Sequence, residues 1–283
     1  MTVSDSQEGF TQRKVLPDEL TEVFERLGSC EGDCVVMHAS LESFGAVEGG
    51  AAMVLHRLLR VLGKSGTLLM PTFTSVSRHS ATHDNYTRPG CWCEGSEGRH
   101  IPFIPELQPD KNIGVIAHRL CSWPASRRSR HPAYSFVAVG KHRDDLVREY
   151  ALDDPLVPLK KFLKQDPRVL TIGVGFDSLT AVHVAEQLQL PLKLVRERAL
   201  TVSSKGQAWV DVVALECSNG FEKLKPHLGT KNVKETDIGL AGAEAYSMRQ
   251  LIDTAESLLE KDSVSLACDN AACLSCSAAP RGR

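Results

Sequence analysis

The stretch CVVMHASLESFGAVEGGAAMVLHRLLRVLGKSGTLLM, residues 34–70, contains one complete strand–helix–strand unit. Its first residues, Cys34–His38, are mostly apolar and include two β-branched valines, and they predict a buried strand. A helix is predicted from Gly49-Gly50 onward, with an apolar stripe made of Val54, Leu55, Leu58, Leu59 and Leu62. The turn at 63–66 leads into a second predicted strand, Thr67–Met70. Two strands joined by a helix through short connections are typical of a parallel sheet with a crossover helix.

The other predicted elements extend this unit into one α/β domain. They are the helices Pro17–Gly28, Arg143–Tyr150 and 240–261, the strands Tyr134–Val139 and Arg168–Val174, and an antiparallel hairpin of Leu192–Val202 with Gln207–Leu215. We therefore expect a mixed, largely parallel sheet with flanking helices and an antiparallel C-terminal hairpin, in a single domain. The expected division is a flexible tail at 1–14, the domain at 15–262 with an irregular insertion at about 75–112, and a cysteine-containing tail at 263–283.

Composition excludes several classes of function. The formal net charge of −2 offers no basic field for a nucleic acid. No apolar run approaches the roughly 20 residues that a membrane span requires, and the polar, acidic N-terminus does not resemble a signal peptide. The nine cysteines form no small secreted framework, so a cytoplasmic location with free thiols or a metal site is expected. Composition does not indicate an oligomeric state.

A histidine stands out in GVGFDSLTAVHVAE, residues 173–186, which follows a predicted strand. Asp177 or Ser178 is expected to cap a helix there. The apolar stripe of this helix is predicted to be Ala181, Val184, Ala185 and Leu188. His183 lies roughly opposite that stripe, so its side chain faces either solvent or a cleft. Only the cleft would give it a function.

The loop from His38 to Gly50 is a candidate ligand site because it follows the carboxyl end of a predicted parallel strand. Its glycines let a ligand approach the backbone, and the start of the next helix offers unpaired N–H groups. The spacing matches neither a Walker loop nor GxGxxG. A plain strand–helix turn is the alternative interpretation.

Five blocks in consistent order resemble the aminoglycoside 3-N-acetyltransferase family, and the similarity runs from about Val15 to about Leu259. They are His38–Gly50, Gly66–Thr74, Asn112–Ile116, Arg128–Gly140 and Gly173–Glu186. The sequence departs from the family pattern at four positions: Ala39, His118, Phe176 and Leu179. These departures predict an acceptor range that is narrower than, or different from, that of the broad enzymes of the family.

The resemblance implies direct transfer of an acetyl group from acetyl-coenzyme A to a small-molecule primary amine, with the 3-amino group of an aminoglycoside as the leading acceptor. An amine is mostly protonated at neutral pH and needs a base, for which histidine is suited. His183 matches the family's catalytic histidine, and Glu216 is near its acidic position, expected to orient the imidazole. Thr180 matches a threonine that could donate a hydrogen bond to the thioester oxygen or the departing thiolate, or it is an ordinary helix residue. Asp177 and Glu186 are expected to hold the cationic acceptor.

Twelve residues are carried over from the resemblance as contacts of the acetyl-coenzyme A donor. They are Ser40, Leu41, Phe44, Gly45, Val47, Gly50, Thr72, Phe73, Arg128, Ser129, Ser135 and Phe136. An arginine in this block could meet a phosphate of coenzyme A. Alternatively, the arginines at 127, 128 and 130 form a solvated basic turn.

The C-terminal tail contains Cys268, Cys273 and Cys276. Three thiolates need a fourth ligand to bind zinc, which Cys217 or His227 could supply. The alternative is a frayed tail with free thiols, and we predict no metal. Two rival functions are a thiol enzyme that uses Cys217 or Cys121, and a non-catalytic protein that binds acyl-coenzyme A.

Overall fold

The computed structural model describes residues 13–79, 100–190, 196–215, 217–229 and 233–277. Across these ranges, a seven-stranded sheet has the order β4-β5-β2-β1-β6-β10-β9. The strands are β1 (Cys34–Ala39), β2 (Thr67–Pro71), β4 (Arg127–Arg128), β5 (Phe136–Gly140), β6 (Arg168–Ile172), β9 (Lys234–Ile238) and β10 (Ala241–Ser247). β1 pairs in parallel with β2 and with β6, and the outer pairings are antiparallel. The mixed sheet with a parallel centre confirms the predicted fold class.

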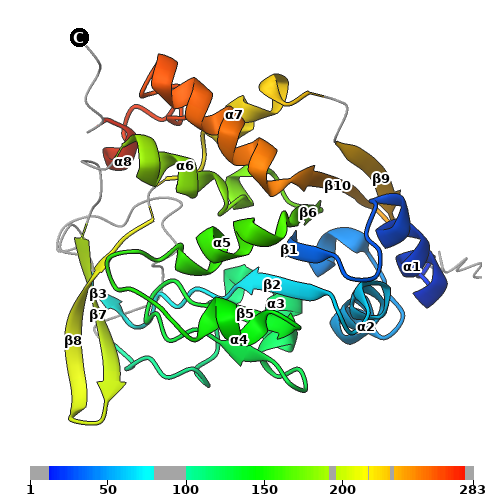
Figure 1. Cartoon of the computed structure of the whole chain (residues 1–283), viewed down its shortest axis with the longest axis horizontal. Helices are drawn as coiled ribbons and strands as arrows, with labels where there is room; N and C mark the ends of the chain where they lie inside the picture. The colour runs from blue at the N-terminus through cyan, green and yellow to red at the C-terminus, as the bar shows by residue number, and fades with distance from the viewer. Residues whose placement is uncertain (1–12, 80–99, 191–195, 216, 230–232, 278–283) are drawn as a thin grey trace, which may run out of the picture.

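Helices cover both faces of this sheet, as the pleat of β1 requires (Figure 1). Val35 and Met37 pack on one face with the helices α1 (Pro17–Arg26), α2 (Gly50–Leu62) and α3 (Val115–Cys121). Val36 packs on the other face with α4 (Arg143–Val147), α5 (Val157–Phe162), α6 (Val182–Gln189) and α7 (Met248–Lys261). Alternate residues of the strand therefore belong to two separate cores. No helix in the described ranges is long and apolar enough to cross a membrane.

The predicted hairpin forms a second, smaller sheet. Its strands β7 (Arg196–Ser203) and β8 (Gly206–Val213) are antiparallel, and the short strand β3 (Arg78–His79) pairs with β7. The hairpin extends away from the main sheet (Figure 1). The segment around β3 thus joins the predicted insertion to the hairpin.

The predicted helix over 240–261 is wrong in its first part. Residues Ala241–Ser247 form β10, and α7 begins only at Met248. In β10, Ala241, Ala243 and Ala245 are buried at every second position, which is the period of a strand. Ser247 then caps α7, because its side chain accepts a hydrogen bond from the backbone N–H of Gln250.

Candidate active site

A cavity of about 400 Å³ lies at the carboxyl ends of β1, β2 and β6. Open α/β sheets bind ligands at this edge. Six of the predicted site residues line it together: Ser40, Leu41, Phe73, Asp177, Thr180 and His183. They come from three segments that are far apart in the chain. The parallel centre of the sheet brings these segments to one place.

The segment that carries the histidine begins with a tight turn. Gly173 has a φ of 63°, and a Cβ at this position would lie 2.3 Å from Cβ of Ser43. The hydroxyl of Ser43 donates a hydrogen bond of 2.9 Å to the carbonyl of Gly173. Only glycine suits this backbone conformation and this close approach. The turn fixes the end of β6 against the segment that follows β1.

The predicted start of the following helix is wrong. Phe176–Ser178 form a 3-10 turn, α6 begins only at Val182, and neither Asp177 nor Ser178 caps it. The backbone N–H of Phe176 instead donates to Oε1 of Glu222, at 2.8 Å. Leu188 is exposed rather than part of the core stripe. The helix is therefore shorter than predicted, and Thr180 precedes it.

His183 is buried, with 7% of its surface exposed, so it faces a cleft rather than bulk solvent. The ring of Phe221 covers it, with ring centroids 4.9 Å apart. Nδ1 of His183 is 2.5 Å from Oε2 of Glu186. An ionised carboxylate can only accept, so Nδ1–H is the donor in this contact, and Nε2 is not engaged by Glu186. The contact holds the imidazole through Nδ1 and leaves Nε2 for a ligand.

A second cavity adjoins the first and shares His183 and Leu215 with it. Glu186, Cys217 and Cys276 also line this second cavity. The histidine thus stands between two spaces. Glu216, which was expected to orient the imidazole, lies outside the described residues. Among the described residues, the carboxylate that contacts the histidine belongs to Glu186. The sequence had predicted that Glu186 binds the acceptor.

The loop after β1 contributes to the site mainly through its first residues. Ser40 and Leu41 line the larger cavity, and Phe44 is buried in the core. Farther along, Val47 forms a bridge with Val15. Two of the glycines predicted to contact the donor have positive φ: Gly45 at 76° and Gly50 at 57°. A Cβ at Gly50 would meet nothing within 4 Å, so space for a ligand is open there.

Arg128 lies in a network rather than in a solvated turn. Its Nε donates to the hydroxyls of Thr72 at 3.1 Å and Ser135 at 2.9 Å, and Nη2 donates to the Thr72 carbonyl at 2.6 Å and the Thr74 hydroxyl at 2.8 Å. Nη1 donates to the carbonyls of Pro105 and Leu107. These bonds engage all three nitrogens of the guanidinium within the protein. Its predicted contact with a coenzyme A phosphate stays a prediction.

Ser129 and Phe136 are buried in the same block. The side-chain oxygen of Ser129 accepts a hydrogen bond of 3.0 Å from the backbone N–H of Phe136. Phe136 packs edge-on against Phe73, with ring centroids 5.8 Å apart. Phe73 lines the larger cavity, so this packing positions one of its walls.

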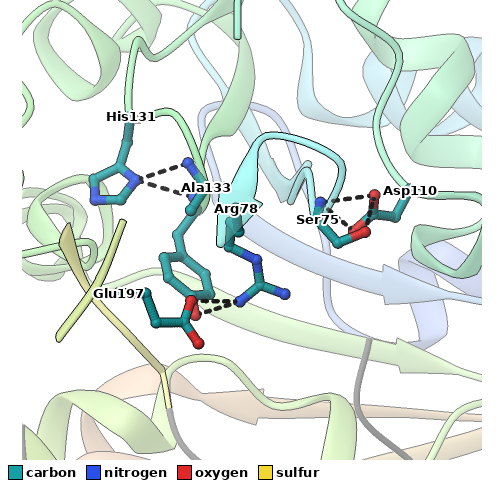
Figure 2. Close-up of polar contacts among 7 residues, drawn as sticks. Ser75, Arg78, Asp110, His131, Ala133 and Glu197 are labelled. Carbon is teal, nitrogen blue, oxygen red and sulfur yellow. Dashed lines mark hydrogen bonds and ion pairs between the residues drawn. The ribbon is translucent and has the colours of Figure 1, made fainter. Parts of the chain in front are cut away.

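Sequence reasoning missed a polar group beside the cavity, shown in Figure 2. Nη1 of Arg78 donates to the phenol oxygen of Tyr134 at 2.6 Å and to Glu197 at 3.2 Å. Asp110 accepts from the backbone N–H and the hydroxyl of Ser75, at 2.8 and 2.9 Å. Arg78, Tyr134 and Asp110 all line the larger cavity. Two of them come from the insertion, where no periodicity in the sequence indicated how it folds.

His38, which lies in β1, has no role predicted from the sequence. It lines the larger cavity and is buried, and burial lowers its pKa to about 4. The imidazole is therefore neutral at physiological pH. Its Nε2 has no hydrogen-bond partner among the described residues.

Comparisons with known proteins identify the family. Residues 36–260 match the family model described as aminoglycoside 3-N-acetyltransferase. The chain belongs to this family. The family predicted from the five sequence blocks is thus confirmed.

Several members of the acetyltransferase family are similar to this protein over most of its chain. The aminoglycoside N(3')-acetyltransferase-like protein YokD of Bacillus subtilis is 30% identical over 84% of this chain and 89% of its own length. Aminoglycoside N(3)-acetyltransferase III of a Salmonella species is 31% identical, over 86% and 90%. Among solved structures, YokD has a TM-score of 0.76 at 28% identity, covering 87% of this chain and 98% of YokD. A mutant of AAC(3)-IVa in complex with a gentamicin has a TM-score of 0.78 at 25% identity, covering 95% and 98%.

Proposed function

We propose that this protein transfers the acetyl group of acetyl-coenzyme A to an amino group of an aminoglycoside, with His183 as the general base and Glu186 as the residue that orients it. The single observation that carries this proposal is the 2.5 Å contact of Glu186 with His183, a buried histidine that lines both cavities. Membership of the acetyltransferase family supports the donor and the acceptor. The gentamicin that is bound to AAC(3)-IVa supports the acceptor further.

The chemistry follows from the free nitrogen of the imidazole. Nε2 of His183 accepts a proton from the amine as the amine nitrogen bonds to the thioester carbon. The carbon–sulfur bond breaks, and the departing thiolate takes this proton from Nε2–H, which leaves the amide, the thiol of coenzyme A and the imidazole ready for another cycle. The carboxylate of Glu186 fixes the tautomer with Nδ1–H and stabilises the imidazolium that forms, as in other histidine–carboxylate pairs. We assign to Thr180, which is buried in the cavity wall, a hydrogen bond to the charge that develops on the thioester oxygen or the departing thiolate.

The larger cavity gives both substrates access to the histidine, because His183 lines it together with residues assigned to the donor and to the acceptor. We assign the donor to the larger cavity, where Ser40, Leu41 and Phe73 offer backbone edges and an apolar wall suited to an amide chain. Asp177, which is exposed in the same cavity, is assigned to the cationic acceptor. The remaining donor contacts predicted from the sequence belong to this proposal as well.

The proposal is tested by replacing the base and a matched histidine. His183→Ala should lower kcat by about 10²- to 10⁴-fold, the range of a lost general base, with the affinity for coenzyme A nearly unchanged. His56→Ala is the control, because His56 is an exposed histidine in a helix on the other face of the sheet. Formation of free coenzyme A is followed by chromatography, with kanamycin-like, gentamicin-like and simple diamine acceptors.

Two results would contradict parts of this proposal. If His183→Ala keeps kcat within a few-fold of the wild type, His183 is not the base. If no aminoglycoside is acetylated while a neutral or anionic amine is, the acceptor assignment is wrong and the acetyl transfer stands.

A further inference from the structure

Four cysteines from two distant parts of the chain meet beside the second cavity. Cys217 follows β8, and Cys268, Cys273 and Cys276 come from the segment after α7. Their sulfur atoms all lie within 4.8 Å of one another. Cys217 therefore supplies the fourth sulfur beside the three cysteines of the tail. His227, the other residue considered as a fourth ligand, is not part of this group.

The surrounding backbone is built to hold this group together. A Cβ at Gly220 would lie 2.2 Å from the carbonyl oxygen of Leu266, so glycine lets the two segments touch. Leu266 is buried in the core. Nζ of Lys223 donates to the Ala267 carbonyl and to Asp269, both at 2.6 Å. The tail is therefore fixed on the segment that follows Cys217, and it is not frayed from 263 to 277.

We propose that Cys217, Cys268, Cys273 and Cys276 bind one zinc ion in a closed, tetrahedral, structural site. Zinc–sulfur bonds of about 2.3 Å give sulfur–sulfur separations of roughly 3.8 Å in a tetrahedron, which the observed cluster can meet with a small contraction. Four soft thiolate ligands in tetrahedral geometry select zinc or iron among the common metals. Because the protein supplies all four ligands, no position is left open for catalysis.

Charge and hydrogen bonding agree with this assignment. Four thiolates at such distances repel one another, so they can ionise together only around a cation. The Cys273–Cys276 pair has the two-residue spacing of zinc-binding motifs. The backbone N–H of Cys268 already donates to Sγ of Cys276 at 3.4 Å. Such second-layer contacts orient a ligand and stabilise its charge.

The site has a structural consequence for the second cavity, because Cys217 and Cys276 line it together with His183 and Glu186. Zinc would fix the C-terminal tail as one wall of that cavity. The metal assignment itself does not rest on the proposed reaction, since metal content is measured without substrate.

The test is the metal content of the purified full-length protein, measured by mass spectrometry of the elements. We expect one zinc per chain, lost in Cys217→Ser and in Cys276→Ser. Cys30→Ser is the matched control and should keep its zinc, since Cys30 is exposed and lies outside the cluster. Reconstitution of the metal-free wild type with cobalt should produce the intense visible absorption of a tetrahedral cobalt–thiolate centre.

A second measurement uses the wild type alone, so that the proposal can be tested even if the cysteine variants fail to fold. Native protein is alkylated with iodoacetamide before and after treatment with a zinc chelator, and the modified cysteines are mapped by peptide mass spectrometry. The four cluster cysteines should react only after chelation, whereas Cys30 should react in both samples. Metal-free protein with freely reactive thiols, a disulfide within the cluster, or iron in place of zinc would each overturn the assignment.

Discussion

The carboxylates of Glu186 and Asp177 belong to the same short segment as His183 but have different surroundings. Glu186 contacts Nδ1 of the histidine, whereas Asp177 is exposed and lines the larger cavity. In the proposed reaction, positive charge develops on the imidazole during the chemical step, so Glu186 should act on that step. An exposed charge attracts a cationic acceptor equally before and during the reaction.

Exchanging each carboxylate for its amide should therefore separate kcat from KM. Glu186→Gln keeps an acceptor for Nδ1–H but loses the negative charge, so we expect kcat to fall by about 10- to 10³-fold with a smaller change in KM. Asp177→Asn should raise the KM of a polycationic acceptor, more at low salt than at high salt, and leave kcat within a few-fold. Steady-state kinetics at two ionic strengths measure both. The reverse pattern would exchange the two roles.

His131 makes the stability of the fold depend on pH. It is buried, its Nδ1 accepts backbone N–H bonds from Ala133 and Tyr134, and burial lowers its pKa to about 4 from 6.5 (Figure 2). As the pH falls from 6.5 towards 4, the imidazole of His131 is protonated in the unfolded chain before it is protonated in the folded protein. The free energy of unfolding should then fall by up to about 3 kcal/mol from this residue alone, and the loss should be complete near pH 4.

His131→Asn tests this dependence, because the amide oxygen can replace Nδ1 as acceptor without titrating. Urea unfolding from pH 7 to pH 4 should show a shallower loss of stability in the variant than in the wild type. Parallel pH curves for the two proteins would show that His131 does not contribute.

At the scale of elements, Arg128 joins β4, the end of β2 and the segment at 105–107 through its hydrogen bonds. A lysine cannot reproduce this planar set of donors. Arg128→Lys should leave buried carbonyls unpaired and lower the free energy of unfolding by about 2–4 kcal/mol. Arg127→Lys, at a side chain that is 57% exposed, should change it by less than about 0.5 kcal/mol.

The same pair of variants also tests the donor contact predicted for Arg128. Calorimetric titration with coenzyme A is made at a temperature where both variants are folded. A large loss of affinity without a loss of stability would identify Arg128 as a phosphate ligand. Lost stability with unchanged affinity would identify it as a structural cation.

Local patterns predicted the elements that have a clear period of their own. The strand–helix–strand unit at 34–70 has apolar residues at regular strand and helix spacing, and the structure reproduces it within a residue or two. β10 was predicted as helix, because its alternating alanines are small and are favoured in helices too. β9 was not predicted, since its residues are mostly polar and it lies at the edge of the sheet.

The site was less predictable because it depends on contacts between distant segments. Phe221, far along the chain, packs against the ring of His183, and no local pattern indicates that contact. The cluster of Cys217 with the tail cysteines has the same origin. The resemblance to the family indicated His183. The contact of its Nδ1 with Glu186 could be found only from the structure.

At the scale of the whole molecule, the proposed direct transfer with His183 as general base predicts a ternary complex without an acetylated enzyme. Initial rates measured over both substrates should give intersecting rather than parallel double-reciprocal lines. Protein incubated with acetyl-coenzyme A alone should keep its unmodified mass by intact mass spectrometry. An acetyl group on Cys217 or Cys121 would instead favour the thiol mechanism.

The position of β1 in the middle of the sheet matters while the chain is still being synthesised. β1 can pair with β2 as soon as residue 71 has left the ribosome, but its other neighbour, β6, begins only at residue 168. Until then the apolar strand Cys34–Ala39 presents an open edge to other nascent chains, and such edges promote aggregation. Chains that stop before β6 should therefore collect in the insoluble fraction after lysis, whereas the full-length chain stays in the supernatant.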